Sequence, residues 1–237
     1  MKKILIPLLM LFLLFSCEDE IKPLEFETIS IKKEFEADIE VYIDKAKPNS
    51  EIAEKINKNI ELSIANSIPI SEENKSTTLE EALTAFDEDF KSFKANFEDS
   101  EQRWALAIET ELLYKTETII SMGLSIYSDT GGAHGNDTIQ FLNFNPETGD
   151  LLTNDNLIID MEGFKQLAES FFLDYMKNEG SDVSEFFFGK PFQLPENIGF
   201  NDEGVVLLYN QYEIASYNQG YTEFVIPMDK ARRFLKF

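Results

Sequence analysis

The chain of 237 residues contains one histidine, one cysteine and one tryptophan. The single cysteine, Cys17, excludes a disulfide bond within the chain, and the single histidine, His134, excludes zinc sites that need two or three histidines. A Ser-His-Asp arrangement would need His134 as its base, and no Gly-x-Ser-x-Gly elbow accompanies it. The sequence therefore identifies no catalytic residue, and we expect neither a metal site nor a cofactor.

Positive charge is also scarce. The chain has 21 Lys and Arg against 44 Asp and Glu, which gives a formal net charge of −23. Such a surface repels phosphate backbones, so we expect no nucleic-acid partner. It would attract basic proteins, and it also keeps an exposed protein in solution. Because carboxylates are so abundant, pairs of them carry no specific signal, and a carboxylate-dependent cell-wall glycan hydrolase stays an alternative.

A long apolar run covers residues 4–15, directly after a short basic segment at the N-terminus. It is too short for a permanent membrane-spanning helix and suits the core of a signal peptide. The run ends in Leu-Phe-Ser-Cys at residues 14–17, which resembles a bacterial lipobox, whose cysteine carries fatty acids such as palmitate. We therefore predict a signal peptide over residues 1–17 and a protein held in the cell envelope by lipid on Cys17. The expected membrane is the outer membrane, with the domain on its periplasmic or surface-exposed face.

Three acidic residues, at positions 18–20, follow Cys17 directly. Such a cluster resembles the surface-export signal of lipoproteins from the Bacteroidetes group. The alternative is a solvated tether between lipid and domain, which we place at residues 18–27.

The remaining chain of about 220 residues is long enough for one large domain or two small ones. Its 21 Phe and 8 Tyr can fill a substantial core. Periodicity predicts strands at 29–35, 39–46, 104–114, 117–127, 136–144, 205–210 and 224–226, and helices at 50–68, 79–97, 162–178 and 229–235. A polar stretch covers residues 71–76, and a hairpin turn is expected at 145–149. We predict an α+β fold with antiparallel sheets, helices packed on one face, and two abutting subdomains, residues 28–116 and 117–237.

Residues 127–136, with the sequence YSDTGGAHGN, hold the only histidine and three of the eleven glycines. Apolar and β-branched residues flank them, so we predict a tight loop between two strands. Gly131 and Gly132 suit positions that need positive φ or close approach. His134 can lock the turn through neighbouring carbonyls or through Asp129 and Asp137, or it can recognise a ligand from the surface.

A second segment, residues 209–217, is rich in tyrosine. Tyr209, Tyr212 and Tyr217, with Glu213 between them, either pack against a helix or offer a binding face, because exposed tyrosines are good interface anchors. Three consecutive phenylalanines at 186–188 present the same alternatives, a mobile aromatic segment or buried core.

These two segments carry a family resemblance. TGGAH at 130–134 and NFNPETGDLL at 143–152 resemble the first half of a bacterial extracytoplasmic domain of unknown function. GVVLLYNQYEIA at 204–215, then Tyr217, Gly220 and FVIP at 224–227, resemble its second half. That domain is found in RsiV-type anti-sigma factors, which sense lysozyme, and in PdaC-type peptidoglycan deacetylases. Residues 28–116 are similar to the companion domain that usually precedes it.

The resemblance departs from the family at residues 216–220, where the family tends to have a proline and small residues. We also find neither a deacetylase domain nor a membrane-spanning link to a sigma-factor-binding segment, so neither activity is transferred. The resemblance implies a stand-alone, Bacteroidetes-like lipoprotein that binds a lysozyme-like protein or peptidoglycan without catalysis. The candidate ligand-binding or fold-signature residues are Gly131, Gly132, His134, Tyr209, Tyr212, Glu213 and Tyr217. A structural scaffold for an envelope complex is the remaining alternative.

Overall fold

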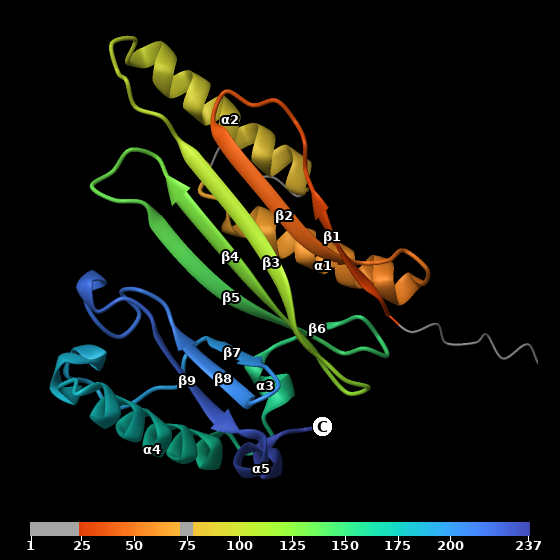
Figure 1. The fold of residues 1–237 in the computed structure, drawn as a ribbon, viewed down its shortest axis with the longest axis vertical. Helices are drawn as coiled ribbons and strands as arrows, with labels where there is room; N and C mark the ends of the chain where they lie inside the picture. Colours follow the sequence, from red (N-terminus) through yellow and green to blue (C-terminus); the bar gives the residue numbers. More distant parts are fainter. Residues whose placement is uncertain (1–23, 72–77) are drawn as a thin grey trace, which may run out of the picture.

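The computed structural model of the chain describes residues 24–71 and 78–237 (Figure 1). The predicted signal peptide, Cys17, the acidic cluster at 18–20 and most of the polar stretch at 71–76 lie outside the described residues. The main elements are β1 (Phe26–Ser30), β2 (Asp38–Ala46), α1 (Glu51–Ser67), α2 (Leu79–Asn96), β3 (Ala105–Lys115), β4 (Ile120–Asp129), β5 (Asn136–Phe144), β6 (Leu151–Leu152), α3 (Asn154–Leu157), α4 (Met161–Glu179), β7 (Asn197–Phe200), β8 (Gly204–Tyr209), β9 (Thr222–Pro227) and α5 (Met228–Ala231).

Two sheets form the framework. The larger has six strands in the order β1-β2-β3-β4-β5-β6, and the smaller has three in the order β7-β8-β9. β3, β4 and β5 are antiparallel, as predicted, and form a meander, whereas β2 and β3 are parallel. The parallel pair arises because α1 and α2 lie between these strands in the chain and carry it back across the sheet. The predicted α+β class is confirmed.

α1 follows from its sequence. The Ser50 side chain caps the helix by accepting a hydrogen bond from the Ala53 N–H at 3.2 Å. Ile56, Ile60 and Ile64 fall four residues apart on one face and are fully buried against the large sheet. Full burial of one such side chain contributes roughly 1.5–3 kcal/mol, so this stripe rather than intrinsic helix propensity fixes the helix on the sheet.

α2 carries a stripe of aromatic side chains along the helix predicted at 79–97, and most of this stripe is core. Thr78 caps the helix by accepting from the Glu81 N–H at 3.3 Å. Phe86 and Phe90 are buried and lie 5.6 and 5.8 Å from the ring of Trp104. Phe97, which the periodicity placed in the same stripe, is 58% exposed because the helix ends at the residue before it.

The segment after β1 shows where side-chain bonding replaces strand pairing. The predicted strand at 29–35 ends at Ser30. The backbone N–H groups of Glu36 and Ala37 instead donate to one oxygen of Asp87 on α2, at 2.7 and 2.9 Å. The Ile31 N–H still donates to the Val41 carbonyl of β2 at 3.2 Å, and the later part of the segment is tied to the helix. The predicted tether also ends earlier than residue 27, because Phe26 already belongs to β1.

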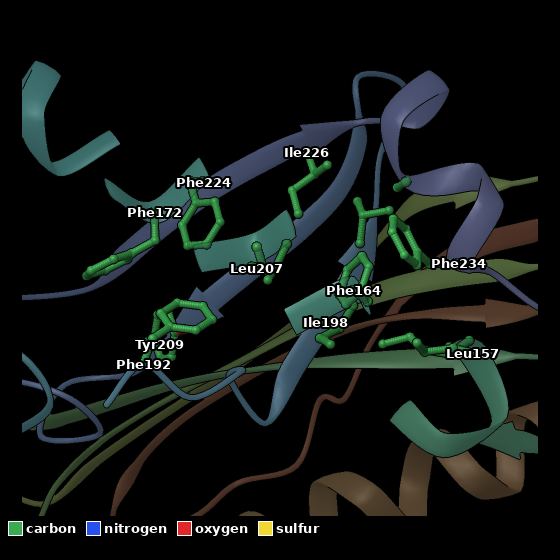
Figure 2. Close-up of a cluster of buried hydrophobic side chains, with 14 of the residues drawn as sticks. Leu157, Phe164, Phe172, Phe192, Ile198, Leu207, Tyr209, Phe224, Ile226 and Phe234 are labelled. Atoms are coloured by element: carbon green, nitrogen blue, oxygen red, sulfur yellow. The ribbon is translucent and has the colours of Figure 1, made fainter. Parts of the chain in front are cut away.

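A second core lies between the small sheet and α4. Phe172 of α4 makes edge contacts with Phe186, Phe187, Tyr209 and Phe224. Figure 2 shows Phe172, Phe224 and Tyr209 gathered on this side of the sheet. β7 was not predicted as a strand. α3 was not predicted either, and the terminal helix is shorter than expected, because α5 passes into a 3-10 turn at Arg232–Phe234.

The two cores divide the molecule in space. The large sheet crosses the boundary predicted between residues 116 and 117, which lies in the turn between β3 and β4. One core contains α1, α2 and the face of the large sheet that they cover, and the other contains α4 and the small sheet. None of the helices in residues 24–71 and 78–237 combines the length and apolarity needed to cross a membrane.

Asparagine side chains join the two sheets. Asn210 accepts from the Ile139 N–H and donates to the Ile139 carbonyl, both at 2.9 Å, as a neighbouring strand would. Asn197 accepts from the Phe141 N–H at 3.3 Å. Asn143, which is 2% exposed, donates to a backbone carbonyl of β7 at 2.7 Å. The outward edge of β5 is therefore bonded to the small sheet through side chains.

Candidate recognition surface

Two loops that the sequence singled out meet at one end of the molecule. The imidazole of His134, in the loop between β4 and β5, stacks on the ring of Tyr217 with centroids 3.9 Å apart and planes inclined by 21°. Tyr212 lies against Tyr217 at 5.6 Å. His134 is exposed and Tyr212 is 56% exposed, so the three rings form an aromatic cluster on the surface.

The two neighbouring glycines of the β4–β5 loop differ in whether the backbone requires glycine. Gly131 has φ +85°, its N–H donates to the Asp129 carboxylate at 2.8 Å, and a Cβ there would collide with the amide of Gln102. At Gly132 a Cβ would meet nothing nearer than the His134 carbonyl, at 3.7 Å. The backbone therefore requires glycine at 131 and has room for a side chain at 132.

The His134 ring is held by its own loop. Its Nδ1 lies 2.8 Å from the Gly135 carbonyl oxygen. A carbonyl oxygen only accepts, so Nδ1 carries the hydrogen and a neutral ring keeps Nε2 as an acceptor. Asp129 bonds the loop backbone at Gly131 instead. The ring is thus fixed by a hydrogen bond at Nδ1 and stacked on Tyr217. Nε2 makes no hydrogen bond within the loop.

Tyr209 and Glu213 lie beneath this cluster and shape the loop. Tyr209 is 1% exposed, and its hydroxyl donates to the Gln193 carbonyl at 2.6 Å. Burial raises the pKa of Tyr209. Glu213 accepts from the N–H groups of Asn210 at 2.8 Å and Glu196 at 3.2 Å. Burial raises the pKa of Glu213 in spite of these two bonds, which favour the ionised form.

Polar atoms without partners lie near the aromatic cluster. Within the described part of the chain, Asp137 Oδ1, Gln211 Oε1 and the Tyr221 hydroxyl are buried and make no hydrogen bond. Burial raises the pKa of Tyr221, and the side-chain interaction with nearby Asp137, the charge of Asp137 and the neighbouring Tyr217 raise it further. The Asp137 carboxylate and the Tyr221 hydroxyl are therefore close, without forming a regular hydrogen bond. Each buried polar atom left in this way costs about 1–3 kcal/mol.

A third segment, residues 182–190, is bonded to the same end. Glu185 accepts from the Gln219 side chain at 2.7 Å, and the Phe187 N–H donates to the Ile214 carbonyl at 2.6 Å. Of the three phenylalanines whose role the sequence left open, Phe186 and Phe187 are buried, whereas Phe188 is 63% exposed. We use the name loop end for residues 130–135, 182–190 and 210–221, which lie on the left of Figure 1.

Backbone strain is concentrated in the loop end. Phe187, Phe188 and Tyr212 have φ of 58°, 52° and 66°, and they are the non-glycine residues with positive φ in residues 24–71 and 78–237. Such conformations cost about 1–3 kcal/mol each and persist where surrounding contacts enforce them. Two of the three side chains, Phe188 and Tyr212, are exposed aromatics. The fold therefore holds these rings in the solvent on a strained backbone.

Comparison with known proteins places this fold. A family model described as "Protein of unknown function (DUF3298)" matches residues 42–229. The chain belongs to the DUF3298 family. A search of curated proteins gives no match.

Two solved DUF3298 structures share the fold. The family member from Bacteroides fragilis is 16% identical, with a TM-score of 0.66 over 90% of this chain and 94% of that one. The DUF3298 protein from Pseudomonas aeruginosa is 22% identical, with a TM-score of 0.62 over 91% of this chain and 95% of that one. At these identities the likeness concerns the fold alone.

The structure brings together three of the seven candidate residues in the aromatic cluster, His134, Tyr212 and Tyr217. Gly131 shapes the loop, Gly132 is exposed, and Tyr209 and Glu213 support the segment from below. Sequence reasoning missed the unpartnered oxygens. It left open whether Phe188 is exposed, and the signal for its exposure was its place at the end of a phenylalanine run followed by Gly189. In the described ranges, no group of three or more His, Cys, Asp or Glu is placed to hold a metal ion.

Proposed function

We propose that this protein is a lipid-anchored binding module of the cell envelope that recognises a basic, lysozyme-like protein through its loop end. The single observation that carries the proposal is the exposed stack of His134, Tyr217 and Tyr212. The resemblance to the extracytoplasmic part of RsiV-type anti-sigma factors, which sense lysozyme, supports the class of ligand. The lipid on Cys17 would hold the domain at the membrane.

The chemistry of the loop end favours recognition of a protein. Tyrosine is enriched among the few residues that carry most of the energy of protein interfaces. Rings already fixed by stacking and backbone strain lose little freedom on binding, which improves affinity. The net charge of −23 would speed the approach of a basic partner and make its binding sensitive to salt.

A specific observation also favours a glycan ligand such as peptidoglycan. The faces of His134 and Tyr217 are apolar, while Asp137 and Tyr221 nearby hold oxygen atoms without partners. Sugar rings present both an apolar face and hydroxyl groups, so they could use both features. Peptidoglycan is therefore the second candidate ligand for the same surface.

The test uses the chain from residue 18 without lipid, assayed for binding to lysozyme and, separately, to soluble peptidoglycan fragments at low and high salt. The variant Tyr212→Ala/Tyr217→Ala should bind the true ligand at least about tenfold more weakly, because truncation of interface anchors typically costs about 2 kcal/mol or more. Tyr42→Ala is the control, since Tyr42 is 49% exposed on β2. Absence of lysozyme binding at low salt would refute the proposal that the ligand is a lysozyme-like protein. An equal loss of affinity in Tyr42→Ala would show that the binding is unrelated to the loop end.

The same samples separate the alternatives. A carboxylate-dependent hydrolase would release muropeptides from peptidoglycan, and one Asp or Glu substitution would abolish the release. A scaffold would bind neither probe and would instead crosslink to other envelope proteins in intact cells.

A further inference from the structure

A groove lies between the two sheets, on the face of the large sheet that α1 and α2 leave uncovered. Its volume is about 320 Å³. The large sheet contributes Glu109 and Glu111 from β3 and Ile139 and Phe141 from β5, and the small sheet contributes Val206 and Glu223. The lining of the groove thus combines apolar side chains with three carboxylates.

Strand geometry explains why the groove is acidic. Side chains alternate along β3, so Ile108 faces the helices and is buried, while Glu109 and Glu111 point to the other face and are exposed. Their partners on β4 are Ser125 and Gly123, which carry little or no side chain. Ser125 and Gly123 add little bulk beside the two carboxylates, although the Leu113 side chain reaches Gly123, and Val206 and Glu223 of the small sheet line the same groove.

The carboxylates of the groove have no counter-charge. The side chains of Glu109, Glu111 and Glu223 make no hydrogen bond or ion pair with any residue in the part of the chain that the structure describes. Partial desolvation raises the pKa of Glu223, although the residue is exposed. A cation in the groove would be attracted by all three carboxylates.

The arrangement suits a ligand with several separated positive charges better than a single metal ion. Among the described residues no three acidic or other ligating groups converge as a metal site requires. Glu109 and Glu111 are two residues apart on one strand face, a spacing of about 7 Å. An extended peptide repeats with the same period, so alternate basic side chains can each meet one carboxylate. Lys and Arg also have apolar stems, which the Ile139, Phe141 and Val206 side chains can contact.

We propose that this groove binds an extended cationic peptide segment whose Lys or Arg residues at alternate positions face Glu109 and Glu111. The proposal concerns a different surface from the loop end and does not depend on the ligand assigned there. The segment would belong to a basic protein or peptide that the protein meets in the envelope.

The probe is a synthetic hexapeptide of alternating Lys and Ala, with blocked termini and a fluorescent label, titrated with the chain from residue 18 by anisotropy. Its control is the isomer with three Lys followed by three Ala, which has the same charge but the wrong spacing. We expect the alternating peptide to bind more tightly. Equal affinities for the two isomers, or no binding of either, would overturn the proposal.

Substitutions test whether the alternating peptide binds in the groove. E109Q/E111Q should weaken binding of the alternating peptide about tenfold, because two close charge pairs are lost. E98Q/D99N is the matched control, since it removes the same charge from exposed positions after α2 and should change affinity less than about twofold by long-range attraction alone. An equal loss in both variants would assign the binding to net charge and refute the groove.

A third variant keeps the two proposals distinguishable. Tyr212→Ala/Tyr217→Ala should leave binding of the alternating peptide unchanged, whatever it does to lysozyme or peptidoglycan binding. Loss of the peptide in that variant would place the peptide at the loop end and overturn the groove as its site. Circular dichroism of each variant confirms that the fold is intact before titration.

Discussion

At the scale of single residues, the β4–β5 loop combines one glycine that the backbone requires with one that it does not. Gly131 has positive φ and lies against Gln102, whereas Gly132 is exposed with room beside it. Both appear in the same motif, but Gly131 also donates its N–H to the Asp129 carboxylate. Gly131 therefore fixes the backbone where the loop that carries His134 begins.

Gly131→Ala should destabilise the protein by about 1–3 kcal/mol, because alanine must adopt positive φ and its Cβ meets a neighbouring side chain. Gly132→Ala should change the free energy of unfolding by less than about 0.5 kcal/mol, as surface substitutions usually do. Urea unfolding of both variants measures the difference. Equal effects would mean that the loop adopts another backbone conformation.

At the scale of elements, the helices are fixed by contacts that reach beyond their apolar stripes. Asp87 of α2 is 3% exposed and holds the chain before β2 through the N–H groups of Glu36 and Ala37. Lys91 pairs with its other oxygen at 2.6 Å. Burial by itself would raise the pKa of Asp87, but the Lys91 hydrogen bond and the two backbone N–H groups together lower it below the ordinary 3.8.

Because the folded-state pKa of Asp87 is depressed, its carboxylate contributes stability above its unfolded pKa, and this is lost as the pH falls through the lower folded value. Asp87→Asn should therefore destabilise the protein by about 1–3 kcal/mol at pH 7, and the gap to wild type should narrow in acid. Thermal unfolding of both proteins between pH 7 and pH 3 measures this difference in stability. Asp99→Asn, at an exposed position, serves as control; a gap for Asp87→Asn that stays constant with pH would contradict the role of its charge.

The elements that sequence predicted well are those with a long local pattern. α1 has four-residue spacing of isoleucine and a capping serine, and β3 to β5 are long runs of β-forming residues joined by short turns. β7 has only four residues, Asn197–Phe200, and is a strand because it pairs with β8. The parallel pairing of β2 with β3 likewise comes from the path through two helices, which no local pattern records.

In the candidate site, too, local patterns predicted some features and tertiary contacts determined the others. The motifs identified both loops, but the contact between His134 and Tyr217 joins residues far apart in sequence. Spacing could not separate buried Tyr209 from exposed Tyr212, because β8 ends at Tyr209 and the chain turns immediately afterwards. With no period to follow in a turn, only the packing of the small sheet on α4 decides which tyrosine is inside.

At the scale of the whole molecule, two cores act as one body because side chains link the sheets. Asn210 satisfies both backbone groups of Ile139, and Ser121 accepts from the Phe200 N–H at 3.0 Å. These bonds lie between the large and small sheets and also position the segment that carries Tyr212 and Tyr217. The link is therefore both structural and a support of the loop end.

Asn210→Ala should cost about 1–3 kcal/mol, because it leaves the Ile139 N–H and carbonyl without partners. It should also loosen the small sheet relative to the large one, so that hydrogen exchange rises in β7 to β9 more than in β2 to β4. Asn218→Ala, at an exposed position of the neighbouring loop, is the control. A uniform rise in exchange across both sheets would show instead that the two cores unfold together.

The bonds from Asn210 and Asn197 to β5 have a further consequence when many copies of the protein lie close together. An open strand edge with free N–H and carbonyl groups is a template on which another chain can add a strand, and such addition leads to polymers and fibrils. Along β5 the N–H and carbonyl of Ile139 and the N–H of Phe141 are already bonded to amide side chains. Short asparagine side chains thus protect this edge from self-association without adding a strand that would cover the groove.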